Sequence, residues 1–141
     1  MWTAVTWLSE IKILFNSNTF ISKSKAMMLD WNEYQKQIQQ RVIEIGRTNH
    51  DVVKGYRELT NAGNSTNLLG AKVRELIALA VAVTRQCDGC IVTHTDAAIK
   101  QGATKEEIVE ALSVAVAINA GAALIFSSRV MDAFNAKIAA L

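Results

Sequence analysis

The segment that most restricts the fold is Leu76 to Val83, a run of eight consecutive apolar residues. Such a run is typical either of a buried strand or of a helix that is apolar on every side. Its three alanines and the preceding Lys72-Val73-Arg74-Glu75 segment favour a helix. Because such a helix has no polar face for water, we expect it to be buried in a helix bundle or between subunits.

The composition supports an all-α fold. The 141 residues include twenty alanines and no proline. Alanine is the strongest helix former and is depleted in strands, and the absence of proline argues against Pro-rich linkers and turn-dense β folds. With 50% hydrophobic and 20% charged residues the chain is too apolar to be disordered. We predict one small helical bundle that oligomerises through its apolar helices.

Helix signals recur along the chain from Asp30. Asp30 with Glu33, and Thr104 with Glu107, have the spacing of a capping box. A loop is expected over 61–67, a helix stop at 101–103 and a break or kink at 119–121. These signals predict helices over 30–45, 51–59, 68–86, 88–101, 104–118 and 121 to the C-terminus, with Asp51 capping the second.

Residues 1–29 differ from the rest and are interpreted as an N-terminal appendage to a domain over 30–141. They carry three lysines and one glutamate, so the remaining twelve bases and twelve acids balance. A neutral domain without a basic stripe gives little support for nucleic-acid binding. We find no secretory signal and expect no membrane span, because the nearest candidate, 111–126, is interrupted by Ser113, Asn119 and Gly121. The chain is therefore expected to be cytoplasmic.

The residues most indicative of chemistry are Cys87, Cys90 and His94. Their spacings of three and four place them on one face of a helix. The cysteines fall at the helix start, where free backbone amides and the positive end of the helix dipole stabilise a thiolate. His94 lies one turn behind Cys90, within reach as a base or proton relay.

Glu75 is expected to join this group. If the chain reverses near Gln86, Glu75 lies eleven residues before the turn and His94 eight residues after it. At 1.5 Å per residue these are depths of about 16 and 12 Å, so the two side chains should meet. Glu75 would then orient the imidazole of His94. A carboxylate in an otherwise apolar helix face is costly to bury without such a partner.

Other interpretations stay open at this point. The two cysteines could be inert packing, or Cys87, Cys90 and His94 could bind zinc with Glu75 or His50, although a second paired motif is absent. Glu75 could instead form a surface ion pair with Lys72 or Arg74. His50 is interpreted as a solvent-facing or capping residue.

The pattern Glu75-x11-Cys87-x-x-Cys90-x-x-x-His94 resembles the AhpD-like alkylhydroperoxidases of the carboxymuconolactone decarboxylase superfamily. The flanking segments Arg74 to Ala80 and Gly102 to Ile108 are similar to that family as well. The resemblance covers residues 30–141 and implies an all-helical subunit in a trimer or hexamer. It favours the peroxidase branch, because the decarboxylases are not built around this cysteine pair.

The resemblance also implies roles for the residues. Cys90 would be the peroxidatic thiolate and Cys87 the resolving thiol, with His94 as base or relay and Glu75 as its orienting partner. The substrate would be a hydroperoxide and the partner a dithiol reductant or a peroxiredoxin, with no cofactor or metal. The best-known members have another histidine between the cysteines, where this chain has Gly89. A thiol–disulfide reductase that regenerates a peroxiredoxin, and a non-catalytic or zinc-binding oligomeric module, are the alternatives.

Overall fold

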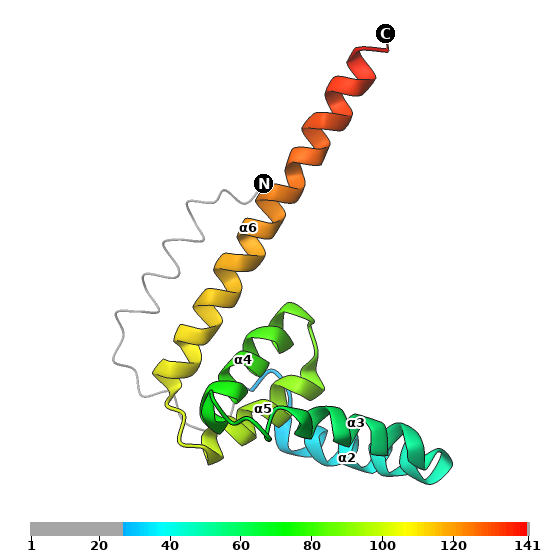
Figure 1. Cartoon of the computed structure of the whole chain (residues 1–141), viewed down its shortest axis with the longest axis vertical. Coiled ribbons are helices and arrows are strands. Elements are labelled where there is room, and N and C mark those ends of the chain that lie inside the picture. The colour runs from blue at the N-terminus through cyan, green and yellow to red at the C-terminus, as the bar shows by residue number, and fades with distance from the viewer. Residues whose placement is uncertain (1–26, 141) are drawn as a thin grey trace. The chain divides into compact units, whose positions relative to one another are not determined.

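The computed structural model describes residues 27–140, which contain five α-helices and no strand (Figure 1). α4 packs against both α5 and α6, while α2 packs against α3 and α5. The all-α prediction is therefore confirmed for the part of the chain that the structure describes. The helices are α2 (Trp31–Thr48), α3 (His50–Ala62), α4 (Gly70–Thr84), α5 (Asp88–Lys100) and α6 (Lys105–Ile138).

The core lies where α4, α5 and α6 meet. Its five buried apolar side chains come from these three helices, and three of them are alanines: Leu79, Ala82, Val92, Ala98 and Ala115. Small side chains let helix backbones approach closely, which explains why the alanine-rich composition suits this packing. The helix predicted over 68–86 is α4, and its apolar run is only half covered, since Ile77 and Val81 are 48% and 54% exposed.

The turns at the ends of α4 and α5 are built in the same way. After α4, the Gln86 N–H donates to the Val83 carbonyl and the Cys87 N–H to the Ala82 carbonyl. After α5, the N–H groups of Gly102 and Ala103 make the equivalent two bonds, to the carbonyls of Ile99 and Ala98. This is the Schellman arrangement, which needs a left-handed residue just past the helix. Gln86 and Gly102 occupy that position, with φ of 52° and 75°.

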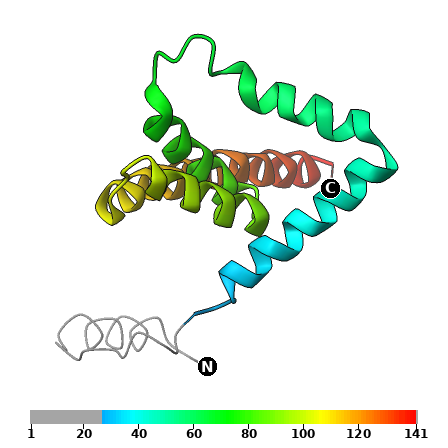
Figure 2. The same cartoon turned by 90° about the horizontal axis from the view of Figure 1, so that it is seen from below.

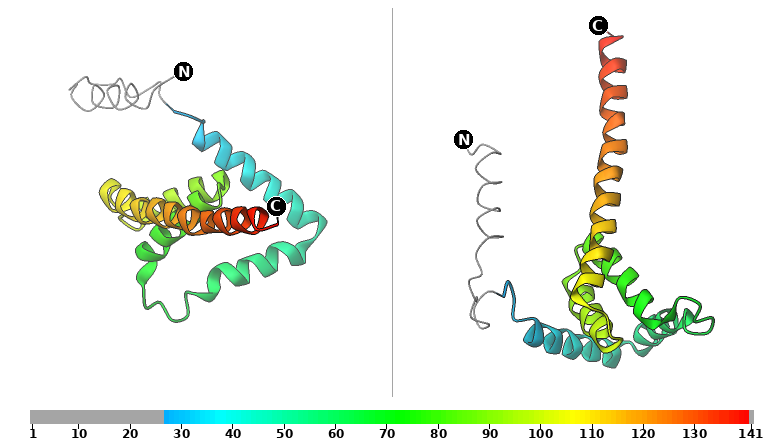
Figure 3. Two further views of the ribbon diagram at one scale, coloured as in Figure 1. Left: turned by 90° about the horizontal axis from the view of Figure 1, so that it is seen from above. Right: turned by 90° about the vertical axis from the view of Figure 1, so that its left-hand side faces the viewer.

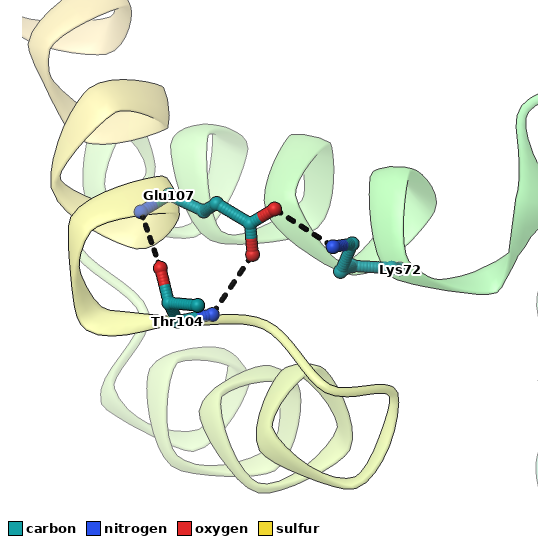
Figure 4. Close-up of polar contacts among 3 residues, drawn as sticks. All are labelled: Lys72, Thr104 and Glu107. Atoms are coloured by element: carbon teal, nitrogen blue, oxygen red, sulfur yellow. Dashed lines mark hydrogen bonds and ion pairs between the residues drawn. The ribbon is translucent and has the colours of Figure 1, made fainter.

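The predicted capping box at the start of α6 is confirmed (Figure 4). The Glu107 N–H donates to Thr104 Oγ1 at 3.2 Å, and the Thr104 N–H donates to Glu107 Oε2 at 2.8 Å. The other carboxylate oxygen of Glu107 accepts from Lys72 Nζ of α4 at 2.7 Å. One glutamate therefore both caps α6 and ties it to α4. Its pKa is lowered, chiefly by the hydrogen bond from Lys72 and then by the Thr104 N–H.

The break predicted at 119–121 is wrong, because α6 continues unbroken from Lys105 to Ile138 (Figure 3). The Asn119 side chain, taken as a helix breaker, donates to the Ala115 carbonyl one turn back and to Thr84 Oγ1 on α4. These bonds hold Asn119 inside the helix instead of ending it. Gly121 is tolerated within the helix, at a cost of about 1 kcal/mol relative to alanine.

α6 is long and apolar enough to cross a membrane by length and composition alone. Helices that pack inside soluble assemblies meet the same criteria, so this property does not distinguish the two. Beyond Ala115, α6 exposes a series of large apolar side chains in the single chain, including Leu124, Ile125, Phe126 and Val130. Oligomerisation through such a surface, the absence of a membrane span and a cytoplasmic location stay predictions.

α2 and α3 meet at the turn before His50 and diverge from it as an open V (Figure 2). We call this pair the α2–α3 arm, residues 31–62. α2 begins at Trp31, directly after the predicted cap Asp30. Asp51 was predicted to cap α3, but the cap is Asn49, whose Oδ1 accepts the N–H of Asp51. The side-chain amide of Asn49 therefore caps α3 in place of the Asp51 carboxylate. The predicted appendage lies, for residues 1–26, outside the described part of the chain.

Candidate redox site

Cys87 is held by the two helices that it joins. Its N–H makes the bond that closes the α4 turn, and its backbone is extended, with φ −106° and ψ 93°. Its Sγ in turn caps α5 by accepting the Cys90 N–H at 3.2 Å. A sulfur that accepts a backbone amide at a helix start is stabilised as a thiolate. The predicted position of the cysteines at a helix start is therefore confirmed, with Cys87 as the capping residue.

Cys87 and Cys90 are joined by a disulfide, with their Cα atoms 5.3 Å apart. They are the two cysteines of the sequence, so the chain in this form has no free thiol. The spacing C-x-x-C on the first turn of a helix brings the two sulfurs together without a long loop to close. The structure thus represents the oxidised state of a dithiol pair.

Glu75 of α4 and His94 of α5 meet across the helical hairpin. Glu75 Oε2 and His94 Nδ1 lie 2.7 Å apart, and both side chains are only partly exposed. A carboxylate can only accept, so Nδ1 carries the hydrogen and Nε2 is left free to take a proton. The contact predicted from the hairpin arithmetic is present, whereas the catalytic roles of the four residues stay predictions.

The alternative partners of Glu75 are engaged elsewhere. Lys72 is bound to Glu107, and Arg74 donates to the side-chain oxygens of Asn64 and Asn67 in the loop before α4. The surface ion pair considered for Glu75 is therefore wrong. His50, considered as a capping residue or a zinc ligand, opens α3 and is exposed beside Asp51, so its interpretation as solvent-facing is confirmed.

Metal binding receives no support from the described residues. Across residues 27–140, no group of three or more histidine, cysteine, aspartate or glutamate side chains is arranged to hold a metal ion. The sulfurs of Cys87 and Cys90 are bonded to each other here, and Glu75 is bonded to His94. The arrangement in the described residues is a disulfide beside a histidine–carboxylate pair.

Gly89, between the cysteines, lies against the α2–α3 arm. A Cβ at Gly89 would be 3.2 Å from Cδ1 of Ile38 on α2. That distance is tighter than ordinary van der Waals contact, so any side chain at this position requires Ile38 to move. The contact between α2 and the start of α5 thus accompanies the absence of a side chain at position 89. Sequence reasoning missed Ile38, because nothing in the helical periodicity of α2 ties it to the cysteines.

A cavity of about 600 Å³ lies beside the disulfide. One side is formed by α5, with Cys87, Cys90 and His94, and the other by the α2–α3 arm. The arm contributes mostly apolar side chains, among them Ile38, Val42, Ile43 and Tyr56. Arg57, at the α3 side, is the permanently charged side chain of this lining. The dithiol and the histidine therefore share one cavity, which is large enough for a small organic molecule.

Comparison with known proteins gives a family model that spans this part of the chain. The model of the carboxymuconolactone decarboxylase family matches residues 50–133, which include Glu75, both cysteines and His94. That family includes decarboxylases and alkylhydroperoxidases. A crystal structure of apo-lpg0406, a carboxymuconolactone decarboxylase family protein from Legionella pneumophila, is similar with a TM-score of 0.60 and 31% identity. The likeness covers 74% of this chain and 94% of that one.

Curated relatives are similar over most of their length. An uncharacterised protein of Haemophilus influenzae is 41% identical over 109 residues, or 77% of this chain and 96% of the relative. Uncharacterised protein 4 in the cox locus of Paracoccus denitrificans is 33% identical over 62% of this chain and 79% of its own length. The family model, the structural likeness and these relatives together show that the chain belongs to the carboxymuconolactone decarboxylase family.

Proposed function

We propose that this protein is a peroxidase that reduces hydroperoxides with the Cys87–Cys90 dithiol. The observation that carries the proposal is the position of this pair in one cavity with His94, whose Nδ1 is held by Glu75 at 2.7 Å. A thiolate at a helix start, next to a base fixed by a carboxylate, is the arrangement that activates a nucleophilic cysteine.

The proposed cycle begins with the reduced dithiol. His94 Nε2 takes the proton of the Cys90 thiol. The Cys90 thiolate then attacks the distal oxygen of the hydroperoxide, the O–O bond breaks, and the alkoxide takes that proton from His94 to leave as an alcohol. Cys90 is now a sulfenic acid. The Cys87 thiol attacks its sulfur, a disulfide forms, and the hydroxyl leaves as water. The Cys87–Cys90 pair has lost two electrons overall and the peroxide has gained them.

An external dithiol would restore the reduced enzyme. Its thiolate attacks the disulfide at Cys87, which gives a mixed disulfide and a free Cys90 thiol. The second thiol of the reductant then displaces Cys87, so the reductant leaves as a disulfide. The position of Cys87 at the cap of α5, ahead of Cys90 in the chain, supports its assignment as the sulfur that exchanges with a partner.

The proposal is tested by intact mass before and after one equivalent of cumene hydroperoxide is added to the reduced protein. We expect the loss of two hydrogens, with one equivalent of alcohol formed. Cys90→Ser should abolish alcohol formation, whereas Cys87→Ser should still form alcohol and stop at the sulfenic acid. Thr93→Ser, on the same helix and in the same cavity, is the matched control. Peroxide consumption by Cys90→Ser at the wild-type rate, or stoichiometric zinc in the purified protein, would contradict the proposal.

A second candidate is a thiol–disulfide reductase that regenerates a peroxiredoxin. The observation that favours it is Gly89, where well-known peroxidases of this superfamily have a histidine, with Ile38 packed over the position. Cys90→Ser should then trap a partner through Cys87 as a mixed disulfide. The rate of hydroperoxide reduction with dithiothreitol as the only reductant distinguishes the two candidate functions. A peroxidase should reduce the hydroperoxide directly, whereas a thiol–disulfide reductase should do so slowly.

A further inference from the structure

The cavity beside the disulfide has a distinctive charge pattern. Its described lining contains no aspartate or glutamate, and Arg57 is the only lysine or arginine in it. Glu75 lies outside the lining and is bonded to His94. Within residues 27–140, the guanidinium of Arg57 has no hydrogen bond or ion pair, so it is available to a ligand.

A neighbouring cavity extends this pattern along the arm. It has a volume of about 650 Å³, lies between α2 and α3, and shares Val42, Ile43 and Arg57 with the first. Its lining adds two further cations, Arg47 and Lys54, and one carboxylate, Glu58. Arg47 lies on α2 and Lys54 on α3, so the charged side chains of the two linings sum to +2. An anion bound at Arg57 would therefore be attracted by more than one charge.

Aliphatic side chains of α2 line the redox cavity together with Gln35 and Gln39. Ile38, Val42 and Ile43 of α2 form a row of aliphatic side chains, and Ile38 lies against Gly89, which precedes Cys90 in the sequence. Hydrogen peroxide has no apolar surface to bury against these aliphatic side chains. A hydrocarbon chain would gain free energy there, because apolar area on both partners is removed from water. The cavity volume also falls in the range typical of organic ligands.

Resting on the proposed peroxidase function, we infer that the preferred substrate is an amphipathic organic hydroperoxide that carries a carboxylate. Its hydrocarbon chain packs on the α2 row, its peroxide group reaches Cys90, and its carboxylate pairs with Arg57. Arg57 is then the residue that determines specificity. A planar guanidinium can bind a carboxylate through two parallel hydrogen bonds, which makes arginine well suited to this role.

The experiment compares kcat/KM for linoleic acid hydroperoxide and for its methyl ester, below their critical micelle concentrations and with dithiothreitol as reductant. The two substrates differ only in the carboxylate. For the wild-type protein we expect a preference for the acid of about tenfold, the size of one charge-assisted hydrogen bond. Arg57→Gln should reduce that ratio to near one, mainly through KM for the acid, and Arg57→Lys should retain part of it.

Arg41→Gln is the matched control, since Arg41 is a cation of the same arm that lines neither cavity and is paired with Glu44. It should keep the wild-type ratio. Competition between linoleate or methyl linoleate and a fluorescent fatty acid, on the oxidised protein, measures the same preference without turnover. Circular dichroism checks that each variant is folded.

The failures of the two proposals can be told apart. If the wild type reduces acid and ester equally well, or if Arg57→Gln behaves like Arg41→Gln, the substrate inference is overturned and the peroxidase stands. If no hydroperoxide is consumed in a Cys90-dependent way, the peroxidase fails and the substrate inference fails with it.

Discussion

Glu75 Oε2 and His94 Nδ1 lie 2.7 Å apart although nineteen residues separate them in the sequence. The contact exists because α4 and α5 form a helical hairpin that turns at Gln86 and Cys87. The same turn sets Cys87 at the cap of α5. The left-handed backbone of Gln86 thus sets the position of both the Cys87–Cys90 disulfide and the Glu75–His94 pair.

Loss of Glu75 should slow the reaction through His94. We expect Glu75→Gln to lower the rate of single-turnover oxidation by hydroperoxide about 10- to 100-fold, the effect seen when a partner that orients a metal-bound histidine is lost. His94→Gln should lower it by about 100-fold or more. The rate is followed by stopped-flow measurement of thiol loss.

The double variant tests whether the two residues act together. Because Glu75 is proposed to act through His94, Glu75→Gln should have little further effect in a His94→Gln background. Glu110→Gln, an exposed carboxylate on α6, is the control and should match the wild type. Independent, multiplying effects of the two changes would contradict the proposed relationship.

The thiols of the reduced protein should be more acidic than a free cysteine. The helix start and the amide of Cys90 favour the thiolate over the thiol, which lowers the thiol pKa. Alkylation rates with iodoacetamide across pH, measured on Cys90→Ser for Cys87 and on Cys87→Ser for Cys90, should give at least one midpoint below the ordinary value of about 8.5. Two midpoints at that value would count against an activated pair.

The two helix-ending turns should respond to substitution in opposite directions. Gln86→Gly relieves a left-handed backbone at a residue with a Cβ, so we expect the free energy of unfolding to rise by up to about 1 kcal/mol. Gly102→Ala introduces that strain and should lower it by about 1 kcal/mol or more. Urea unfolding at one fixed protein concentration measures both. Changes of the same sign would be inconsistent with the shared geometry.

The bond between Lys72 and Glu107 should make stability depend on pH. The folded-state pKa of Glu107 is lowered by Lys72 and by the Thr104 N–H. A lowered acid pKa contributes stability above the ordinary glutamate value of 4.5 and loses it as pH falls through the lower folded value. The advantage of the wild type over Glu107→Gln should therefore be full at neutral pH and disappear in acid.

Glutamine keeps the acceptor of the capping box, so this variant removes the charge and leaves the cap. Thermal unfolding of both proteins between neutral pH and pH 3 measures the difference. Lys72→Met should show the same loss of pH dependence. A constant difference between wild type and Glu107→Gln across this range would exclude the linkage.

Local sequence determined the helices, their caps and the spacing of the chemical residues. Thr104 with Glu107, and Gln101 through Ala103, act on neighbouring residues, so their effects could be read without a tertiary structure. The Glu75–His94 contact was also predictable, because a rigid helical rise and a single turn fix the depth of both side chains.

Only the tertiary structure determined the features that require contacts between residues far apart in the chain. Asn119 looks like a helix breaker in sequence, and it stays helical because Thr84 lies across from it on α4. Ile38 and Arg57 become candidate site residues only because the α2–α3 arm forms a cavity with the cysteines at the start of α5. Periodicity identifies the apolar face of a helix, but it does not show which other helix that face packs against. The proposed substrate site depends on the packing of the α2–α3 arm beside α5.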